Sequence, residues 1–344
     1  GHPHARRGDH GARVVPDLPR LVDELHLLGV VPLGTDRRVV AEHVEEVRPR
    51  QLLLAVRPAL RVIVDLALEL LEHRQPPARR GLVGAHDHAL HARDAVQRRI
   101  VKSLFGDLAF RDQVGLSAIN SINWARLMPQ IVYYVTAALA LGGLDRPLSF
   151  AVPTGNFGNI FAGYAAMKMG LPIKRFICAS NRNDILTRFF DTGIMERRVV
   201  EPSLSPSMDI QVSSNFERLM FELLDRNGDQ TRDIMARFQE TGQFTLTREM
   251  MGSDIDLFSG FRCDDAATLD EIGRTWRHDG IMIDPHSAIG LAAARTAAQT
   301  DDDPIVALAC AHPAKFPDAV EKATGIRPEL PPHLSDLMER PHQG

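Results

Sequence analysis

The first hundred residues of this 344-residue chain contain no serine, asparagine, lysine, phenylalanine, tyrosine, tryptophan, methionine or cysteine. Serine and lysine are among the commonest residues of globular proteins, so a segment of this length without either is unusual. The same segment holds nine of the fourteen histidines. All the missing residue types return from Val101 onward. The composition therefore divides the chain near residue 100.

The chain as a whole also lacks features that would indicate particular environments or partners. It has no stretch of 18 or more apolar residues, so we expect no membrane span. Its basic start has no apolar segment behind it, so we expect no signal peptide. The three cysteines, Cys178, Cys263 and Cys310, are widely spaced and odd in number, which favours the reducing cytoplasm over a disulfide framework. The net charge of −4 gives no reason to expect nucleic acid or an anionic membrane as partner.

Three interpretations compete for residues 1–100. An Arg/Leu-rich helical domain fits the apolar spacing of residues 18–29 and 60–74, but a domain of this size without aromatic residues packs poorly. The His-rich stretch 84–94 could be a metal site, but no second ligand cluster supports it, so we prefer solvent-facing histidines and expect no metal. The hypothesis we favour is that residues 1 to about 98 are read from the wrong frame or strand of a GC-rich gene. The segment would then be atypical or disordered.

The remainder of the chain has the pattern of an α/β domain, which we place at residues 101–330, followed by a tail over 331–344. Residues 121–143 have the apolar spacing of a long helix that ends at a glycine pair. A buried strand over 148–153, a glycine turn, a helix over 159–170 and a strand over 173–180 make one βαβ unit. This unit indicates a mostly parallel sheet covered by helices.

Two further strand–helix pairs are predicted late in the chain. The first joins a strand over 280–285 to a helix over 286–299, and the second joins 304–311 to 316–325. Between the early and late pairs, Phe216–Arg277 is charged and largely helical in pattern. We interpret this stretch as an insertion or small subdomain.

The turn after the strand at 148–153 is the most informative stretch of the sequence. Gly155 and Gly158 let the chain bend sharply and bring backbone N–H groups close to a ligand. The following helix presents unpaired N–H groups and the positive end of its dipole, which suit a phosphate. Asn156 and Asn159 can add side-chain donors or cap the helix. The spacing matches neither the Rossmann fingerprint nor a Walker A loop, so an anion site and an ordinary strand–helix loop both stay open.

Seven stretches between Val101 and Pro328 resemble threonine synthase, a family of fold-type II pyridoxal-phosphate enzymes. They are SLFGDLAFRD, SINWARLMPQIVYY, VPTGNFGN, NDILTRFF, SPSMDIQVSSNFERL, DPHSAIG and AHPAKFPDAV, in the family's order. The resemblance implies an α/β fold of the tryptophan synthase β type, with a parallel sheet and flanking helices. It also implies pyridoxal 5′-phosphate as cofactor, with its phosphate cradled by Gly155, Asn156, Phe157, Gly158 and Asn159.

The resemblance assigns further residues to the substrate and the cofactor. Ser121, Asn123 and Arg126 match residues near the substrate's phosphate, where an arginine can offer a bidentate fork. The alternative is a capped helix start with a solvated arginine. Cys310 stands where the family usually has a threonine that faces the pyridine nitrogen. It could equally be a small apolar residue at a buried strand end.

His286 and Ser287 belong to a segment that the family places beside the active site, which implies contact with substrate. The same segment also fits a helix that is capped by Asp284, with Pro285 in the first turn. Both interpretations can hold together. Lys315, in the AHPAKF stretch, fits a structural role better than a catalytic one.

The reaction implied by the resemblance converts O-phospho-L-homoserine and water to L-threonine and phosphate, the last step of threonine biosynthesis. In the family, a lysine forms a Schiff base with the cofactor and moves protons. It lies in a Phe-Lys-Asp context upstream of SLFGDLAFRD, and a Ser/Gly-rich segment there contacts the substrate carboxylate. This chain has neither feature, since its lysines are Lys102, Lys168, Lys174, Lys315 and Lys322. We therefore identify no catalytic residue and expect the chain as written to be inactive.

Three hypotheses follow. The chain is a threonine synthase, acting on a small-molecule substrate as a monomer or homodimer, whose first third is corrupted in this sequence. Alternatively, it is a catalytically dead remnant that binds phosphate, free cofactor or a partner chain. The third hypothesis is a related pyridoxal-phosphate lyase that acts on another phosphorylated amino acid.

Overall fold

The structure is a computed structural model that describes residues 30–32, 103–104, 107–115, 121–141, 146–301 and 303–337. Strand β1 (Val30–Pro32) is the part of the first hundred residues that it describes. The interpretations made above for the rest of residues 1–100 therefore lie outside the described residues. Lys102 and the end of the predicted tail, residues 338–344, also lie outside them.

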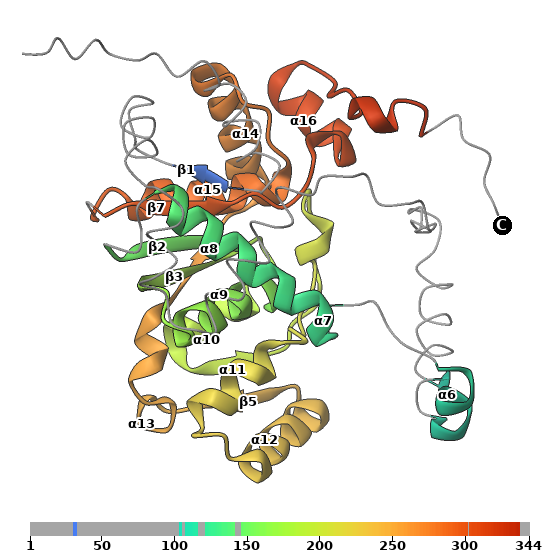
Figure 1. The fold of residues 1–344 in the computed structure, drawn as a ribbon, viewed down its shortest axis with the longest axis vertical. Helices are drawn as coiled ribbons and strands as arrows, with labels where there is room; N and C mark the ends of the chain where they lie inside the picture. The colour runs from blue at the N-terminus through green and yellow to red at the C-terminus, as the bar shows by residue number, and fades with distance from the viewer. Residues whose placement is uncertain are drawn as a thin grey trace, which may run out of the picture.

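A five-stranded sheet forms the centre of the molecule (Figure 1), in the order β1-β7-β2-β3-β6. Strands β7, β2, β3 and β6 are parallel, and β1 pairs with β7 in the antiparallel direction. All six residues of β2 are buried, as expected for a strand covered on both faces. The bounds are β2 (Leu148–Pro153), β3 (Ile173–Ser180), β6 (Phe258–Arg262) and β7 (Ile305–Leu308).

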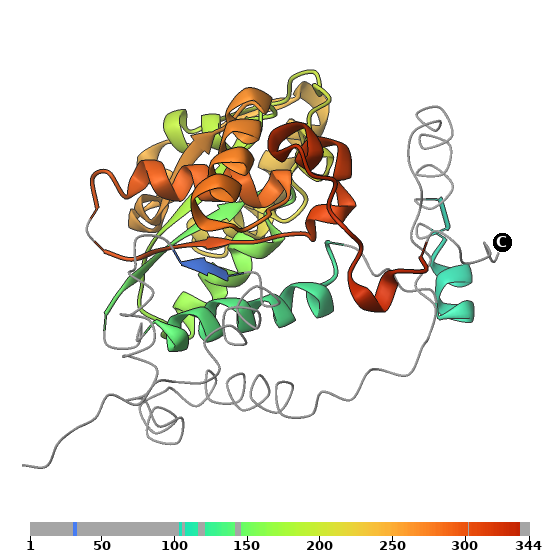
Figure 2. The same cartoon turned by 90° about the horizontal axis from the view of Figure 1, so that it is seen from above.

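Helices cover the two faces of the sheet, and alternate residues of β2 face the two layers. Leu148, Phe150 and Val152 belong to the larger core with α8 (Ile131–Ala140) and α9 (Gly158–Lys168). Ala151 belongs to a second core with α14 (Asp265–Asp279) and α15 (Pro285–Ala297). Figure 2 shows α8 on one side of the sheet and the late helices on the other.

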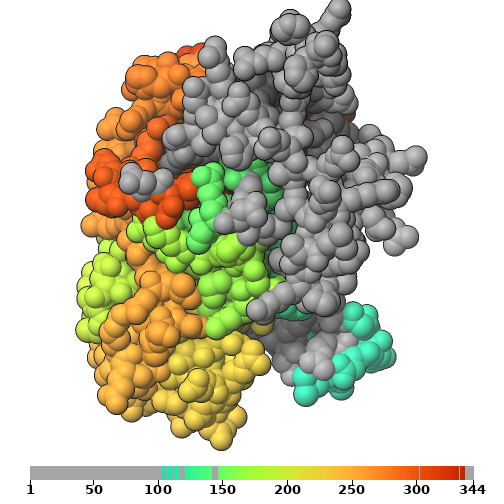
Figure 3. Space-filling view, turned by 60° about the vertical axis from the view of Figure 1, so that its left-hand side comes forward, coloured from blue at the N-terminus to red at the C-terminus, as the bar shows by residue number. Residues whose placement is uncertain are grey.

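The remaining elements connect and extend these layers. The helices are α6 (Leu108–Val114), α7 (Trp124–Leu127), α10 (Ile185–Thr192), α11 (Phe216–Leu223), α12 (Gly228–Thr241), α13 (Arg248–Met251) and α16 (Pro317–Thr324). The two-stranded sheet joins β4 (Ile194–Glu196) to β5 (Gln243–Thr245). The 3-10 turns are η1 (Met128–Gln130), η2 (Pro206–Met208), η3 (Ser253–Leu257), η4 (Pro313–Lys315) and η5 (Pro332–Leu334). Helix α6 lies away from the central sheet and its helices in both ribbon views, and it is at the lower right of the space-filling view (Figure 3).

The predicted strands at 148–153 and 173–180 are confirmed at both ends. The strand predicted at 280–285 is wrong, because those residues form no regular structure before α15 begins. Gly280 ends α14 in a left-handed conformation and Pro285 begins α15, so the residues between them connect two helices directly. The insertion over 216–277 stays a prediction, and this range includes strand β6 of the central sheet. No helix in the described part of the chain is long and apolar enough to cross a membrane.

Candidate anion-binding site

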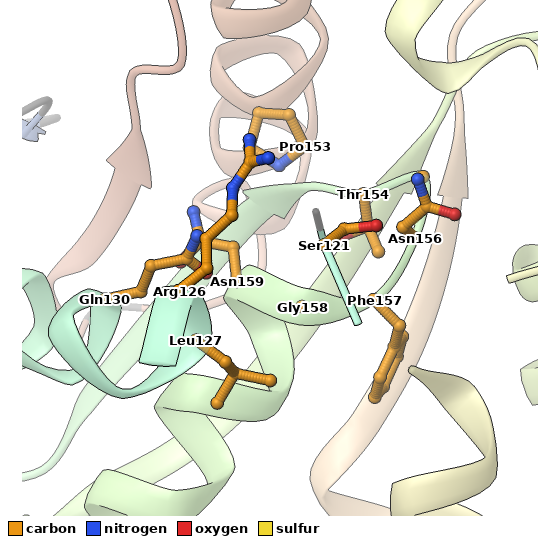
Figure 4. Close-up of a pocket in the computed structure, with 11 residues that line it drawn as sticks. Ser121, Arg126, Leu127, Gln130, Pro153, Thr154, Asn156, Phe157, Gly158 and Asn159 are labelled. Carbon is orange, nitrogen blue, oxygen red and sulfur yellow. The ribbon is translucent and has the colours of Figure 1, made fainter. Parts of the chain in front are cut away.

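A cavity of about 150 Å³ lies at the carboxyl end of β2, where the chain turns into α9 (Figure 4). One wall is the turn 153–159, and the other comes from the segment that contains α7 and η1. The lining residues are Ser121, Arg126, Leu127, Gln130, Pro153, Thr154, Gly155, Asn156, Phe157, Gly158 and Asn159. These lining residues include no carboxylate, and they include one arginine. The composition of the cavity therefore suits an anion.

The left-handed residue of the turn is not a glycine. Phe157 adopts the left-handed conformation, with φ 62° and ψ 4°, which costs a non-glycine residue roughly 1–2 kcal/mol. Its buried ring packs against Phe216 and Phe258, with centroids 5.4 and 6.1 Å away, and this packing offsets the cost. Gly155 also lies in the bend, but neither Gly155 nor Gly158 has a positive φ, so the left-handed residue of the turn is Phe157. Gly155 is needed for space, because a Cβ there would lie 2.9 Å from the Ser207 carbonyl oxygen.

The carbonyl groups of the turn are bound by side chains outside it. The Ser213 hydroxyl donates to the Gly155 carbonyl at 2.8 Å, and both the backbone N–H and the side-chain NH₂ of Asn215 donate to the Asn156 carbonyl at 3.0 Å. The N–H and C=O of a trans peptide point in opposite directions, so the next N–H groups point away from these donors. Within the described residues, Phe161 is the first whose N–H bonds back along α9, to the Phe157 carbonyl at 3.0 Å. The preceding N–H groups are available to a ligand.

The asparagine side chains of the turn do not cap α9. The cap position is Phe157, which makes no side-chain cap bond, so the capping role predicted for Asn156 or Asn159 is wrong. Asn156 instead accepts a hydrogen bond from the Ser214 hydroxyl at 3.2 Å. Asn159 lies beside Gln130 in the cavity, and the buried amide oxygens of both have no hydrogen-bond partner in the described part of the chain.

The residues predicted near the substrate's phosphate lie on the opposite wall. Ser121 and Arg126 line the cavity together with the turn. Asn123 does not line it; its side chain caps α7 by accepting from the Ala125 N–H at 2.9 Å. The structure therefore brings two of these three residues to the same cavity as the turn 153–159.

His286 and Ser287 lie in a buried network around Asp284. The Asp284 carboxylate caps α15 and accepts from the His286 ring at 2.9 Å, from the Ser287 hydroxyl, and from the Ala311 N–H at 3.2 Å. Burial by itself raises the pKa of Asp284, but the hydrogen bonds from His286 and Ser287 outweigh it and lower that pKa overall. The other ring nitrogen of His286 accepts from the Ser207 N–H at 3.3 Å. The predicted cap by Asp284 is confirmed, and neither His286 nor Ser287 lines the cavity.

Comparisons with known proteins show what this chain is similar to. Residues 287–343 match the family model described as threonine synthase, C-terminal. The chain is 48% identical over 244 residues to threonine synthase of Pseudomonas aeruginosa, covering 71% of this chain and 52% of that protein. The crystal structure of pyridoxal-phosphate-bound threonine synthase from Brucella melitensis aligns with a TM-score of 0.68 at 51% identity, over 71% of this chain and 52% of that one.

The resemblance to threonine synthase is confirmed. A second structure, the threonine synthase from yeast, aligns with a TM-score of 0.63 at 34% identity over 70% of this chain and 52% of that one. The expected fold class, a fold-type II parallel sheet with flanking helices, is confirmed by these structures and by the central sheet. The chain spans about half the length of the threonine synthases that it matches.

Cys310 follows β7, at the position where the resemblance implies a threonine. Its backbone N–H donates to the Ser287 hydroxyl at 2.8 Å, so Ser287 links Cys310 to Asp284. The residue is exposed, but the surrounding protein desolvates its thiol. This desolvation and the charge of Asp284 raise the pKa of the Cys310 thiol, which is therefore protonated at neutral pH. Its place opposite the cofactor ring stays a prediction.

None of the four lysines in the described residues lines the cavity. Lys168 pairs with Asp254 at 2.6 Å, and Lys174 pairs with Asp301 at 2.9 Å. Lys315 lies over the ring of Phe316 at 5.4 Å, and its structural role stays a prediction. Lys322 is in the last turn of α16. The described part of the site thus holds no lysine of the kind that threonine synthases use.

Sequence reasoning missed the residues that hold the turn in place. Tyr134 donates to the Asn159 carbonyl at 2.9 Å, and burial raises the pKa of this tyrosine well above its usual value. Ser213 and Asn215 bind the carbonyls of the turn from 58 and 59 residues away along the chain. Their stretch, SSNFERL, was recognised as part of the resemblance, but no local pattern indicates what they contact.

Proposed function

We propose that the cavity at the start of α9 binds the phosphate group of pyridoxal 5′-phosphate. The observation that carries this proposal is the turn itself, whose carbonyls are bound from outside while its N–H groups are left for a ligand. The lack of a lining carboxylate and the presence of Arg126 support the same ligand class. The relative from Brucella melitensis was crystallised with this cofactor bound.

We further propose that the chain is the carboxyl-terminal part of a threonine synthase, which converts O-phospho-L-homoserine and water to L-threonine and phosphate. When bound, the cofactor supplies an electron sink for loss of the substrate's α-proton. Residues 155–159 would hold its phosphate, while Ser121 and Arg126 on the facing wall would orient a phosphorylated substrate. Asn123 would fix the start of α7 that carries Arg126.

The roles of the Asp284 network are proposed from its contacts. Because the polar atoms of His286 and Ser287 are bonded to protein groups, they act by holding the end of β7 and Cys310 in place. Cys310 would then face the cofactor ring as a neutral thiol. A neutral partner leaves the ring nitrogen unprotonated, which weakens the ring as an electron sink.

The lack of a lysine at the site favours the second candidate, a chain that binds the cofactor but does not turn over substrate. A group that moves the α-proton is required for the reaction, and no described lysine lies at the cavity. We propose that the chain as written has this limited function. A related lyase for another phosphorylated amino acid is the remaining alternative.

Equilibrium dialysis of the full chain against pyridoxal 5′-phosphate and against pyridoxal tests the phosphate site. We expect the phosphorylated form to bind at least tenfold more tightly, because only it can use the N–H groups of the turn. Equal binding of the two would overturn the phosphate site. The same protein should release no phosphate from O-phospho-L-homoserine. Phosphate release, or a borohydride-stable cofactor adduct on a lysine, would overturn the proposed inactivity.

A further inference from the structure

Asn215 lies between the two walls of the cavity and contacts both. Its side chain is fully buried at the start of α11. One hydrogen of its NH₂ group reaches the Asn156 carbonyl at 3.0 Å, and the other reaches the Ser121 carbonyl at 2.8 Å. Its backbone N–H also donates to the Asn156 carbonyl at 3.0 Å. A single amide group thus joins the phosphate turn to the segment that carries Arg126.

Arg218 determines which way this amide faces. Its Nε donates to the Asn215 side-chain oxygen at 3.1 Å, and its terminal nitrogen donates to the Ile122 carbonyl at 2.8 Å. A guanidinium can only donate hydrogen bonds, so the atom that it meets must be the amide oxygen. The NH₂ group must then face the two carbonyls, which can only accept. The guanidinium also lies 5.8 Å from the Trp124 ring, which holds it in this position.

We propose that Asn215 is a positioning residue for the phosphate site, which sets the separation of the two cavity walls and the direction of the turn's N–H groups. This inference rests on the proposed function. Asn215 does not line the cavity, so it would act on the ligand through Asn156 and Ser121. Both residues line the cavity directly.

The variant Asn215→Asp tests the proposal with almost no change of shape. The new carboxylate keeps an acceptor for Arg218, but it places a charged oxygen against two carbonyl oxygens that previously received hydrogen bonds. The turn and the Ser121 segment should therefore move apart in a folded protein. The matched control is Asn227→Asp, at the cap of α12, where aspartate and asparagine serve equally well.

Dialysis against pyridoxal 5′-phosphate gives both the dissociation constant and the number of sites per folded chain. If Asn215 positions the two cavity walls, N215D should keep the number of sites and lose at least tenfold in affinity. N227D should match the unmodified chain. A merely structural role predicts fewer sites with an unchanged dissociation constant, and that result would overturn the proposal. If N215D does not fold, Arg218→Met, which frees the amide to rotate, should lose two- to fivefold in affinity. An unchanged affinity in that variant would overturn it as well.

This experiment distinguishes failure of the proposed phosphate site from failure of the proposed role of Asn215. If the unmodified chain shows no preference for pyridoxal 5′-phosphate over pyridoxal, both the phosphate site and the role of Asn215 are overturned. If it shows the preference and N215D keeps it in full, the phosphate site stands and the role of Asn215 is overturned.

Discussion

Phe157 combines an unfavourable backbone conformation with a favourable side-chain environment. At most positions glycine is less stable than alanine, because it loses more backbone entropy on folding. At a left-handed position a protein with glycine is the more stable of the two. The Cβ of alanine clashes with the backbone there, and glycine has no Cβ. The aromatic cluster around Phe190, Phe216 and Phe258 explains why neither of these small residues stands here.

Substitution of Phe157 separates these two effects. Both Phe157→Ala and Phe157→Gly should lose about 3–5 kcal/mol of unfolding free energy, because they remove a buried ring. The glycine variant should be the more stable of the two by about 1 kcal/mol, since it relieves the left-handed conformation. Urea unfolding of the two variants measures the difference. An alanine variant as stable as the glycine variant would show that residue 157 is not left-handed in solution.

Asp284 should make the stability of the protein depend on pH in the acid range. Its pKa is lowered in the folded state, so its contribution is present above the unfolded pKa of about 3.9 and is lost as pH falls through the folded value. Asp284→Asn should cost about 3 kcal/mol at pH 7. The difference between the two proteins should shrink as pH falls from 5 towards 3. A difference that is constant over this range would contradict the assigned hydrogen bonds.

At the scale of elements, α9 lies unusually close to α8 and to the sheet. A Cβ at Gly163 would come within 2.4 Å of the Tyr134 ring and 2.6 Å of the Phe176 ring. Tyr134 is the residue that binds the Asn159 carbonyl, so the contact that packs α9 also holds the first turn of this helix. The packing of these elements and the geometry of the cavity are therefore linked.

The variant Gly163→Ala tests this contact. It should lower the unfolding free energy by about 1–3 kcal/mol, because one of the two rings must leave its position. The matched control is Gly228→Ala at the start of α12, where a Cβ meets no atom within 4 Å. That control should be neutral or slightly stabilising. Thermal unfolding of both variants measures the effect, and equal melting temperatures would contradict the close packing.

The elements that sequence patterns predicted well are those specified by their own residues. Strands β2 and β3 are short apolar runs bounded by turn residues, and both were predicted to the residue. The segment before Pro285 is also apolar, but it lies between the left-handed end of α14 at Gly280 and the first residue of α15, and it forms no strand. The glycine turn after β2 was recognised from its local sequence, although the spacing did not distinguish an anion site from an ordinary strand–helix loop. The hydrogen bonds that Tyr134, Ser213 and Asn215 make to this turn depend on tertiary contacts that no local pattern encodes.

At the scale of the whole molecule, ligand binding should stabilise the fold. A ligand that binds only the folded state at one hundred times its dissociation constant adds about 2.7 kcal/mol. For a folded body of this size, that corresponds to a rise in melting temperature of roughly 5–11 °C. We expect pyridoxal 5′-phosphate to give this shift and pyridoxal to give much less. Equal shifts in a thermal scan would indicate binding that does not involve the phosphate.

The amino-acid composition of the chain changes near residue 100, and this change can be tested on the gene. Sequencing the coding DNA upstream of the Val101 codon, in all six frames, tests whether the first segment is read correctly. A frame that encodes a Phe-Lys-Asp segment and a Ser/Gly-rich loop would supply what the described site lacks. The active protein would then be a full threonine synthase. DNA that confirms the chain as written would favour the non-catalytic alternative.

The hydrogen bonds that Ser213 and Asn215 make to the turn 153–159 have a consequence for synthesis of the chain. The turn leaves the ribosome before Asn215, which follows Asn156 by 59 residues. At about 5–20 residues per second, the turn waits roughly 3–12 s before the groups that bind its carbonyls are translated. During this interval the carbonyls are hydrated, and the N–H groups have no fixed direction. The nascent chain would therefore acquire the proposed phosphate site only after α11 has emerged, well after the turn itself.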